Sequence, residues 1–466
     1  MWRWSAQPGK ASPPWPPPWR GPNSPTTCSR RGSCTRWRSP APRPLEADLA
    51  ADLASQLALT VDGFLAASAI FQTQTPAQVL AGLGPLEQLL GALSLLAGAR
   101  PVRLAIDGLD QLTPQAAPPV DAALRTLTGD PKFGHIKLVV TARPDASLPP
   151  GAVTLELEQL DDEHLERYLR RRGVPAAAVA AVSQRAEGNW LVARLLADLT
   201  VDGDLPAGQL PTGLQDAYRH ELRRAGSHDP DRWAQQLRPV LAVLAAAGVG
   251  PVLPMVLLCA ASGRLGGPEA PARVRDVLVQ LRGLVVRGAP GTPEEQLGVF
   301  HTTFADYLLS DPEVGIDGPR AHAALADAID QLAPASAHDP SDPLHGYAAS
   351  AQVEHLWAAG RQQQVVATVR ARESHIPAAN LARWAAWQPR IQGALGADHL
   401  DTLAARHQLA YWTGQAGDAV GALRLYREVL ADNERVLGPD HPDTLAARHQ
   451  MAYWTGKTGR ADWAES

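Results

Sequence analysis

One segment of the sequence occurs twice in almost the same form, and this repetition limits the folds open to the C-terminal part. Residues 395–414 read LGADHLDTLAARHQLAYWTG, and residues 437–456 read LGPDHPDTLAARHQMAYWTG, a separation of 42 residues. Between them, residues 419–437 have apolar side chains at the spacing of an amphipathic helix. The pattern predicts a pair of helices per repeat, with small residues such as Ala410 and Ala452 where helices approach closely.

A helix pair that recurs at this interval resembles the tetratricopeptide repeat of the 42-residue, kinesin-light-chain-like type. The resemblance implies that residues 395–466 bind a protein partner. About one and a half repeats are too few to bury a stable solenoid face. We therefore expect the chain to be a fragment at both ends, with the parent protein continuing beyond Ser466.

The overall composition fits a soluble protein of about three domains. Hydrophobic residues make up 45% of the chain, charged residues make up 20%, and the net charge is −5. This balance gives no reason to expect nucleic acid as a partner. The three cysteines, Cys28, Cys34 and Cys259, have no metal-ligand spacing, so a cytoplasmic location is the simplest expectation.

Residues 239–262 form an uncharged apolar stretch that is nearly long enough to span a bilayer. Gly248, Gly250, Pro251 and Pro254 interrupt the stretch, and these residue types favour a turn. We therefore predict two short buried helices around a tight turn, and we expect no membrane partner.

Two apolar segments in the first third of the chain predict neighbouring strands of a parallel sheet. Residues 102–106 and 136–140 are mostly aliphatic without alternation, which predicts strands buried on both faces. Asp107 and Asp110 follow the first strand, and Arg143 follows the second. Open α/β sheets bind ligands at the carboxyl ends of their strands. Acids beside a cation at that edge predict a site for Mg²⁺ and nucleotide phosphates.

The segments LAIDGLDQ and LVVTARP resemble the Walker B and sensor-1 motifs of the STAND class (signal transduction ATPases with numerous domains), which includes the NACHT and NB-ARC ATPases. The resemblance implies that Asp107 belongs to the Mg²⁺ shell, that Asp110 positions the attacking water, and that Arg143 senses the γ-phosphate. An Asp-Gly turn that closes an ordinary strand is the alternative. The implied fold class is α/β followed by all-α: an incomplete P-loop NTPase parallel sheet, a helical lid, a winged helix and tetratricopeptide hairpins.

Two segments after the predicted sheet resemble the lid of the same family. Residues 161–172 begin with acids and end with bases, which suits a helix dipole. Residues 187–191, EGNWL, resemble the turn that opens a lid helix near the adenine. Trp190 replaces the usual Pro or Phe of that turn, which puts the adenine contact in doubt, and we expect Trp190 to pack in the core.

Residues 300–308, FHTTFADYL, resemble the signature of a STAND winged-helix domain. The resemblance implies that His301 contacts the β-phosphate of bound ADP and holds a closed state. Capping or packing within the winged helix is the alternative role for His301. Phe300, Phe304 and Leu308 share a helical face and are predicted core residues in either case.

The first 44 residues differ from the rest, with eight basic residues, no acidic residue and five tryptophans. One interpretation is a disordered, basic, Pro-rich tail. The other is translation out of frame: residues 1–15, back-translated with allowed codons and read two bases on, give VALVGAAGQGKSAV. That peptide contains a strand followed by the GxxxxGKS phosphate loop of the family. The strand before this loop should lie inside the sheet. As written, the chain lacks GxxxxGK[ST], so we predict weak or absent binding of ATP and ADP.

The resemblance to the STAND class implies a switch, a regulatory ATPase that uses Mg²⁺ and ATP or ADP and is impaired without its phosphate loop. The resemblance also implies oligomerisation on activation. The alternative is an interaction scaffold in which the repeats act beside a degenerate ATPase core. A transcription regulator is disfavoured because residues 214–312 carry no basic stripe. The predicted segments are 1–44 (tail or out-of-frame), 45–158 (partial NTPase core), 159–209 (lid), 210–315 (winged helix), 316–394 (helical linker) and 395–466 (repeats).

Overall fold

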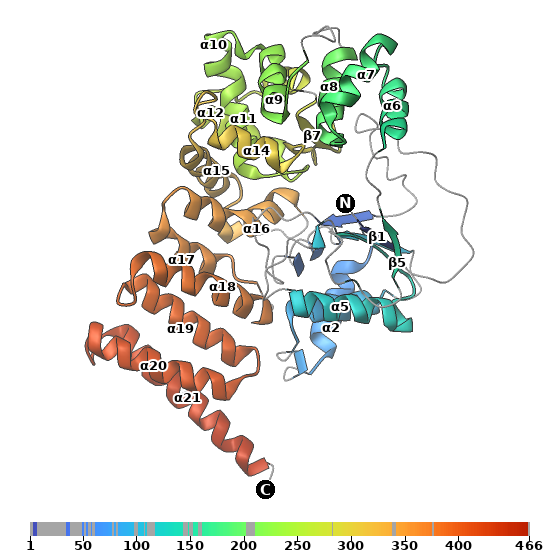
Figure 1. Ribbon diagram of the computed structural model, residues 1–466. Helices are drawn as coiled ribbons and strands as arrows, with labels where there is room; N and C mark the ends of the chain where they lie inside the picture. The colour runs from blue at the N-terminus through green and yellow to red at the C-terminus, as the bar shows by residue number, and fades with distance from the viewer. Residues whose placement is uncertain are drawn as a thin grey trace. The chain divides into compact units, whose positions relative to one another are not determined.

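The fold of the chain is seen in a computed structural model, in which most described residues lie in helices (Figure 1). Residues 154–334 form one compact unit, and residues 28–153 and 335–466 belong to a second. The structure describes residues 3–6, 34–37, 49–50, 53–54, 57, 61–76, 79–80, 83–96, 101–106, 108–109, 117–142, 148, 152–156, 161–201, 210–281, 283–337, 342–374 and 377–464.

A five-stranded sheet has the strand order β2-β3-β4-β1-β5. β2, β3 and β4 run parallel, and Leu104 pairs in register with Leu138. The strands predicted at 102–106 and 136–140 are confirmed. Two further strands lie within the first 44 residues, where a disordered tail would have none. The strands are β1 (Arg3–Ala6), β2 (Cys34–Trp37), β3 (Val102–Ile106), β4 (Ile136–Ala142) and β5 (Val153–Glu156).

The burial of β3 and β4 corrects the prediction that both faces of these strands are covered. Alternate residues are buried in each strand, and Arg103 and Lys137 are exposed. The two cations are paired in register on the same face, and burying them without partners would be costly. The core therefore lies on the opposite face, against apolar residues of α2 (Phe64–Gln74), α4 (Pro85–Ser94) and α5 (Ala117–Gly129).

The unit of residues 154–334 combines helices with a small antiparallel sheet of order β6-β8-β7. Between α9 and α11, two π-helical turns, Arg223–Ser227 and Trp233–Leu237, flank the short α10 (Pro230–Arg232). The other elements are α6 (Asp162–Arg171), α7 (Ala176–Ala186), α8 (Trp190–Val201), α9 (Leu214–Leu222), α11 (Arg238–Ala247), β6 (Leu253–Pro254), α12 (Met255–Arg264), α13 (Pro271–Gln280), β7 (Val285–Gly288), β8 (Gln296–Val299), α14 (Thr302–Ser310) and α15 (Gly318–Leu332).

The uncharged stretch at 239–262 forms two helices, α11 and α12, joined by a turn, as predicted. Gly248 and Gly250 have φ of 102° and 89°, a backbone region that glycine adopts without strain. Within the described part of the chain, no helix has the length and apolar character that a bilayer span requires. α15 packs on α11 and α12, and the compact unit runs to Pro334.

The predicted core aromatics of this unit are buried, but Trp190 is not. Phe304 and Leu308 have no exposed surface, and Phe300 is 6% exposed. Trp190 is 48% exposed, and its ring meets the edge of Tyr168 at a centroid distance of 4.7 Å. The prediction for Trp190 is wrong because the buried face of α8 is formed by other residues at helical spacing, Val192, Leu195, Leu196 and Leu199.

The C-terminal residues form a series of helices in which neighbours along the chain pack on one another (Figure 1). The predicted helix at 419–437 is confirmed as α20. Ala410 is fully buried, as predicted, whereas Ala452 is exposed. The helices are α16 (Pro343–Ala358), α17 (Gln362–Ala371), α18 (Pro377–Leu395), α19 (Leu400–Gln415), α20 (Ala419–Val436) and α21 (Pro442–Ala464).

Candidate functional site

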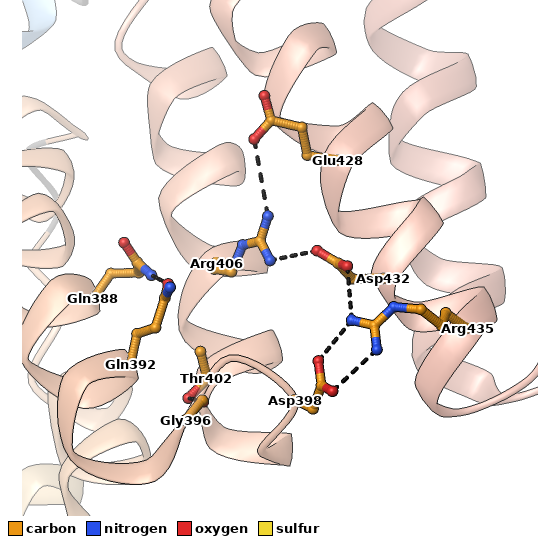
Figure 2. Close-up of polar contacts among 9 residues, drawn as sticks. All are labelled: Gln388, Gln392, Gly396, Asp398, Thr402, Arg406, Glu428, Asp432 and Arg435. Atoms are coloured by element: carbon orange, nitrogen blue, oxygen red, sulfur yellow. Dashed lines mark hydrogen bonds and ion pairs between the residues drawn. The ribbon is translucent and has the colours of Figure 1, made fainter.

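Matching turns place the helices of the two sequence copies. Gly396 and Gly438 have φ of 92° and 93°, so both turns use a left-handed backbone that favours glycine. The Thr402 hydroxyl donates to the Gly396 carbonyl at 2.7 Å (Figure 2), and Thr444 repeats this bond to Gly438 at 2.8 Å. Because these residues recur in sequence, α19 and α21 begin in the same way.

A groove lies between α18, α19 and α20. Its lining combines the half-buried Leu409 and Leu425 and the buried Val429 with amide and charged side chains. The Gln388 side-chain amide donates to the Gln392 side-chain oxygen at 2.7 Å (Figure 2). Stacked helical repeats use concave surfaces of this kind for binding. The lining residues are Gln388, Gln392, Arg406, Leu409, Leu425, Glu428 and Val429.

A chain of alternating charges runs from this groove to the turn before α19 (Figure 2). Arg406 donates to Asp432 and lies 3.8 Å from a Glu428 oxygen. Arg435 donates to Asp432 at 3.0 Å and holds Asp398 through two bonds, of 2.6 and 3.0 Å. Three carboxylates and two guanidinium groups alternate, so this series of charges has a carboxylate at each end, Glu428 and Asp398.

The pKa values of these groups follow from their partners. Burial alone would raise the pKa of Asp432, but hydrogen bonds from Arg435 and Arg406 outweigh it and lower that pKa. The hydrogen bond from Arg435 also lowers the pKa of Asp398, and both carboxylates raise the pKa of Arg435. All three groups are therefore charged at neutral pH. Most are solvent-exposed, so the network sets geometry and specificity more than stability.

Arg406 and Arg448, which occupy the same position in the two sequence copies, form ion pairs with different residues of α20. Arg406 turns forward to α20, whereas Arg448, at the same repeat position, donates back to Glu434 of α20 at 2.7 Å. The residue at the Glu434 position in the preceding helix is Gln392, which carries no charge to hold Arg406. This difference leaves Gln392 and Gln388 bonded to one another on the rim of the groove.

Sequence reasoning did not single out the groove residues. Each charged residue, read alone, resembles a solvated helix surface. The recurrence of arginine at positions 406 and 448 and the spacing of Glu428, Asp432 and Arg435 on one face of a helix are the signals that mark them.

The predicted nucleotide-site residues Asp107, Asp110 and Arg143 lie outside the described residues. Their neighbours are described: the Gly108 backbone N–H donates to the Thr141 hydroxyl at 2.9 Å. The ends of β3 and β4 are thus joined at the edge where the prediction places the acids and the cation. Among the residues that the structure describes, no three His, Cys, Asp or Glu side chains gather as a metal site.

His301, the fourth predicted site residue, caps the start of α14. Its Nδ1 accepts the Thr303 backbone N–H at 3.2 Å and lies 2.8 Å from the Thr303 hydroxyl, which contacts the Tyr218 hydroxyl at 2.7 Å. Burial raises the pKa of Tyr218 to about 12. An accepting Nδ1 places the proton of a neutral imidazole on Nε2. The capping role proposed for His301 is therefore present.

Burial of His407 between α19 and α20 makes these helices sensitive to acid. Desolvation lowers the pKa of His407. The charge of Asp443 raises this pKa, and the charge of Arg370 lowers it further, but desolvation is the largest effect. A folded-state pKa below the unfolded value gives stability that is present above the unfolded pKa, about 6.5, and is lost as pH falls through the folded pKa. In urea titrations at decreasing pH, the unfolding free energy of the unchanged chain should fall below about pH 6.5, and we expect the fall to be smaller in His407→Gln. His449→Gln, at the exposed equivalent position, should leave the loss unchanged; equal effects would contradict the assignment.

Comparison with known proteins agrees with the geometry of this region. No curated protein matches the chain. Residues 402–443, which run from α19 through α20 to the start of α21, match the tetratricopeptide repeat family. Stacked helical repeats of this kind present extended binding surfaces, so the match supports a role in protein–protein interaction for this region.

Proposed function

We propose that the chain is a STAND-type switch in which ATP or ADP sets the state of an ATPase core and the repeat helices receive a protein partner. In this scheme the ADP state is closed, exchange for ATP opens it, and the partner biases the equilibrium because it contacts the two states differently. The partner-binding part is supported by the groove of α18, α19 and α20, whose α19 and α20 residues lie within the stretch 402–443 that matches the tetratricopeptide repeat family.

The geometry of the sheet supports the nucleotide part of the proposal. β3 and β4 are parallel and in register, so residues 107 and 143 follow strand ends at the same edge. The bond from Gly108 to Thr141 joins these ends. β1 lies between β4 and β5, the inner position expected for the strand before the phosphate loop. Asp107 is proposed to hold Mg²⁺, Asp110 to position water and Arg143 to meet the γ-phosphate.

The unit of residues 154–334 supports the proposed winged helix. α12 and α13 precede the antiparallel pair β7 and β8, which is the helix-then-hairpin order that a winged helix requires. His301 stands at the start of α14 with Nδ1 engaged in the cap. A ring held in this way has a fixed orientation, which suits a residue proposed to contact ADP.

The chemistry of the groove suits a partner segment that carries an apolar side chain beside a basic one. Leu409 and Leu425, which are half-buried, supply apolar surface. Glu428, at the acidic end of the charge chain, has a side chain that is 49% exposed, and Arg424 and Arg406 lie at 3.3 and 3.8 Å from it. These are long contacts for an ion pair, so a partner's basic group can replace either one.

The alternative is a scaffold in which the repeats act without nucleotide. The test is a variant chain in which residues 1–15 are replaced by VALVGAAGQGKSAV, which restores a GxxxxGKS loop. We expect this variant to bind ADP and ATP, and we expect Asp107→Asn in the same variant to abolish Mg²⁺-dependent hydrolysis.

His301→Ala should remove one charge-assisted bond, about 1.5–3 kcal/mol. ADP binding should therefore weaken by roughly ten- to a hundredfold, while ATP affinity changes far less.

Calorimetry on the variant and on the chain as written distinguishes the two functions. Absence of nucleotide binding by a folded variant would favour the scaffold. Equal loss of ADP and ATP binding on His301→Ala would limit His301 to its role as the cap of α14.

A further inference from the structure

One charged side chain of α8 reaches the open end of the β7–β8 hairpin. Arg194 donates to the Gly283 carbonyl at 3.1 Å, and its guanidinium lies over the Phe300 ring at 4.9 Å from the centroid. Gly283 comes shortly before β7, and Phe300 directly follows β8. The Phe300 backbone N–H donates to the Leu284 carbonyl at 3.1 Å. Arg194 therefore contacts both ends of the hairpin at the point where a backbone bond joins them.

Two further charges hold Arg194 in this direction. The Asp198 carboxylate, one turn further along α8, lies 3.9 Å from the Arg194 Nε and accepts a hydrogen bond from Arg172, which directly follows α6. The three side chains are between 21% and 23% exposed. Burial lowers the pKa of Arg194, and the charge of Asp198 opposes this shift. Because an arginine stays protonated in proteins, its charge at this depth requires these partners.

The contact with the hairpin lies on the side of α8 opposite to its apolar cluster. Val192, Leu196 and Leu199 pack with residues of α6 and α7 in one buried cluster. Arg194 and Asp198 project from the other side of the helix, as their spacing requires. Hydrogen bonds from a charged donor are more directional than apolar packing. The position of α8, in the proposed lid, is thereby linked to the position of the hairpin end.

The residue that follows Phe300 is His301, the cap of α14. Its Nδ1 accepts the Thr303 backbone N–H at 3.2 Å. Phe300 is 6% exposed, and the Tyr218 ring meets it edge-on at a centroid distance of 6.3 Å. Because Phe300 and His301 are consecutive, a shift of the Phe300 ring and backbone also shifts the cap. The contacts thus form a continuous path from α8 to the imidazole.

We propose that Arg194 is a positioning residue through which the lid helix α8 fixes the ring of His301. While α8 contacts the hairpin end, Phe300 is held and the Nδ1 of His301 stays in the cap of α14. Displacement of α8 releases Phe300, loosens the cap and lets the imidazole turn. The inference deepens the proposed function and rests on it, since it names the contact by which movement of the lid reaches the residue proposed to bind ADP.

The experiment uses the full chain as written, without nucleotide. Arg194→Met keeps an unbranched apolar side chain but removes the charge and the N–H donors. We expect the backbone amides of residues 300–303 to exchange hydrogen roughly tenfold faster or more, while the amides of α11 and α12 change little. Diethylpyrocarbonate should modify His301 faster as well, because the reactive lone pair of a neutral imidazole is on the nitrogen that now accepts the cap hydrogen bond. Mass spectrometry measures both rates.

Arg264→Met is the matched control, since Arg264 lies in the same unit and donates to the Gln331 side chain of α15 at 2.6 Å. It should leave the exchange of residues 300–303 and the modification of His301 unchanged. Asp198→Asn should give a smaller increase than Arg194→Met, because it removes the charge that orients Arg194 and leaves the guanidinium in place.

Two outcomes would overturn the proposal. Equal acceleration of exchange in α11, α12 and residues 300–303 would show that Arg194→Met only destabilises the unit. Unchanged rates at residues 300–303 and at His301 would show that the ring is fixed without α8. Neither measurement involves nucleotide, so a failure of the loop-restored variant to bind ADP would reject the proposed switch without altering these rates.

Discussion

Replacing Gly414 by alanine is expected to destabilise the repeat helices, whereas the same change at Gly456 is expected to be neutral or stabilising. Gly414 is buried in α19, and a Cβ at this position would overlap the ring of Trp454 from α21. Trp454 is 2% exposed, so its ring has little room to move. At Gly456, the equivalent position of the second copy, no atom of the described residues outside the helix's own backbone lies within 4 Å of where a Cβ would lie.

The expected difference in unfolding free energy between the two variants is about 1–3 kcal/mol, the usual cost of overpacking a close-packed site. Both variants gain up to about 1 kcal/mol because alanine favours a helix more than glycine does. Urea titrations followed by circular dichroism measure both values. If the two variants shift the transition equally, α21 does not pack on Gly414, and the order of helices in the array is different.

The parts of the fold that the sequence predicts are those with a local, repeated or periodic signal. The helix at 419–437, the strands at 102–106 and 136–140, and the paired helices at 239–262 all belong to this class. The prediction that β3 is buried on both faces followed its apolar residues and gave no weight to Arg103, which pairs in register with Lys137 of β4 on the exposed face of the sheet.

A degenerate repeat shows where sequence periodicity fails. α18 begins at Pro377 and α20 at Ala419, the same separation as that of the two sequence copies. Four of the five buried positions of α20 are buried in α18, and the fifth, Leu381 at the position of Leu423, is half-buried, yet Trp384 stands where Tyr426 does. Packing conserves burial rather than residue identity, so only the structure shows that the predicted linker at 316–394 contains a helix pair of the same kind.

The candidate sites also differ in how far local sequence predicts them. The strand ends that carry Asp107 and Arg143 were located from local sequence, and the roles of these residues stay predictions. The groove depends on which partner Arg406 selects, and that choice follows from Gln392 standing where Glu434 stands in the next helix. A contact between three helices of this kind has no signature in a single segment.

Removing the Glu373 carboxylate is expected to destabilise the packing of α18 against α19, the first helix of the first sequence copy. Trp384 of α18 and Trp412 of α19 both donate their indole N–H to the same Glu373 oxygen, at 2.8 and 2.7 Å. Glu373→Ala deprives two indole N–H groups of their acceptor, one from a ring with no exposed surface. The expected loss of unfolding free energy is about 2–4 kcal/mol. Glu373→Gln keeps an oxygen acceptor and should lose less.

In the second sequence copy, an acceptor can be added to an indole N–H instead of being removed from it. Trp454, the equivalent of Trp412, is buried, and its Nε1 has no hydrogen-bond partner among the described residues. Gln415 occupies the position of Glu373 in that copy. Gln415→Glu places a charged acceptor there and is expected to stabilise the repeats by about 0.5–1.5 kcal/mol. In a Trp454→Phe background the gain should vanish, because phenylalanine has no N–H to donate. A gain that persists in that background would show that the carboxylate acts on another group, and the two indole bonds to Glu373 would then not be a property of the repeat position.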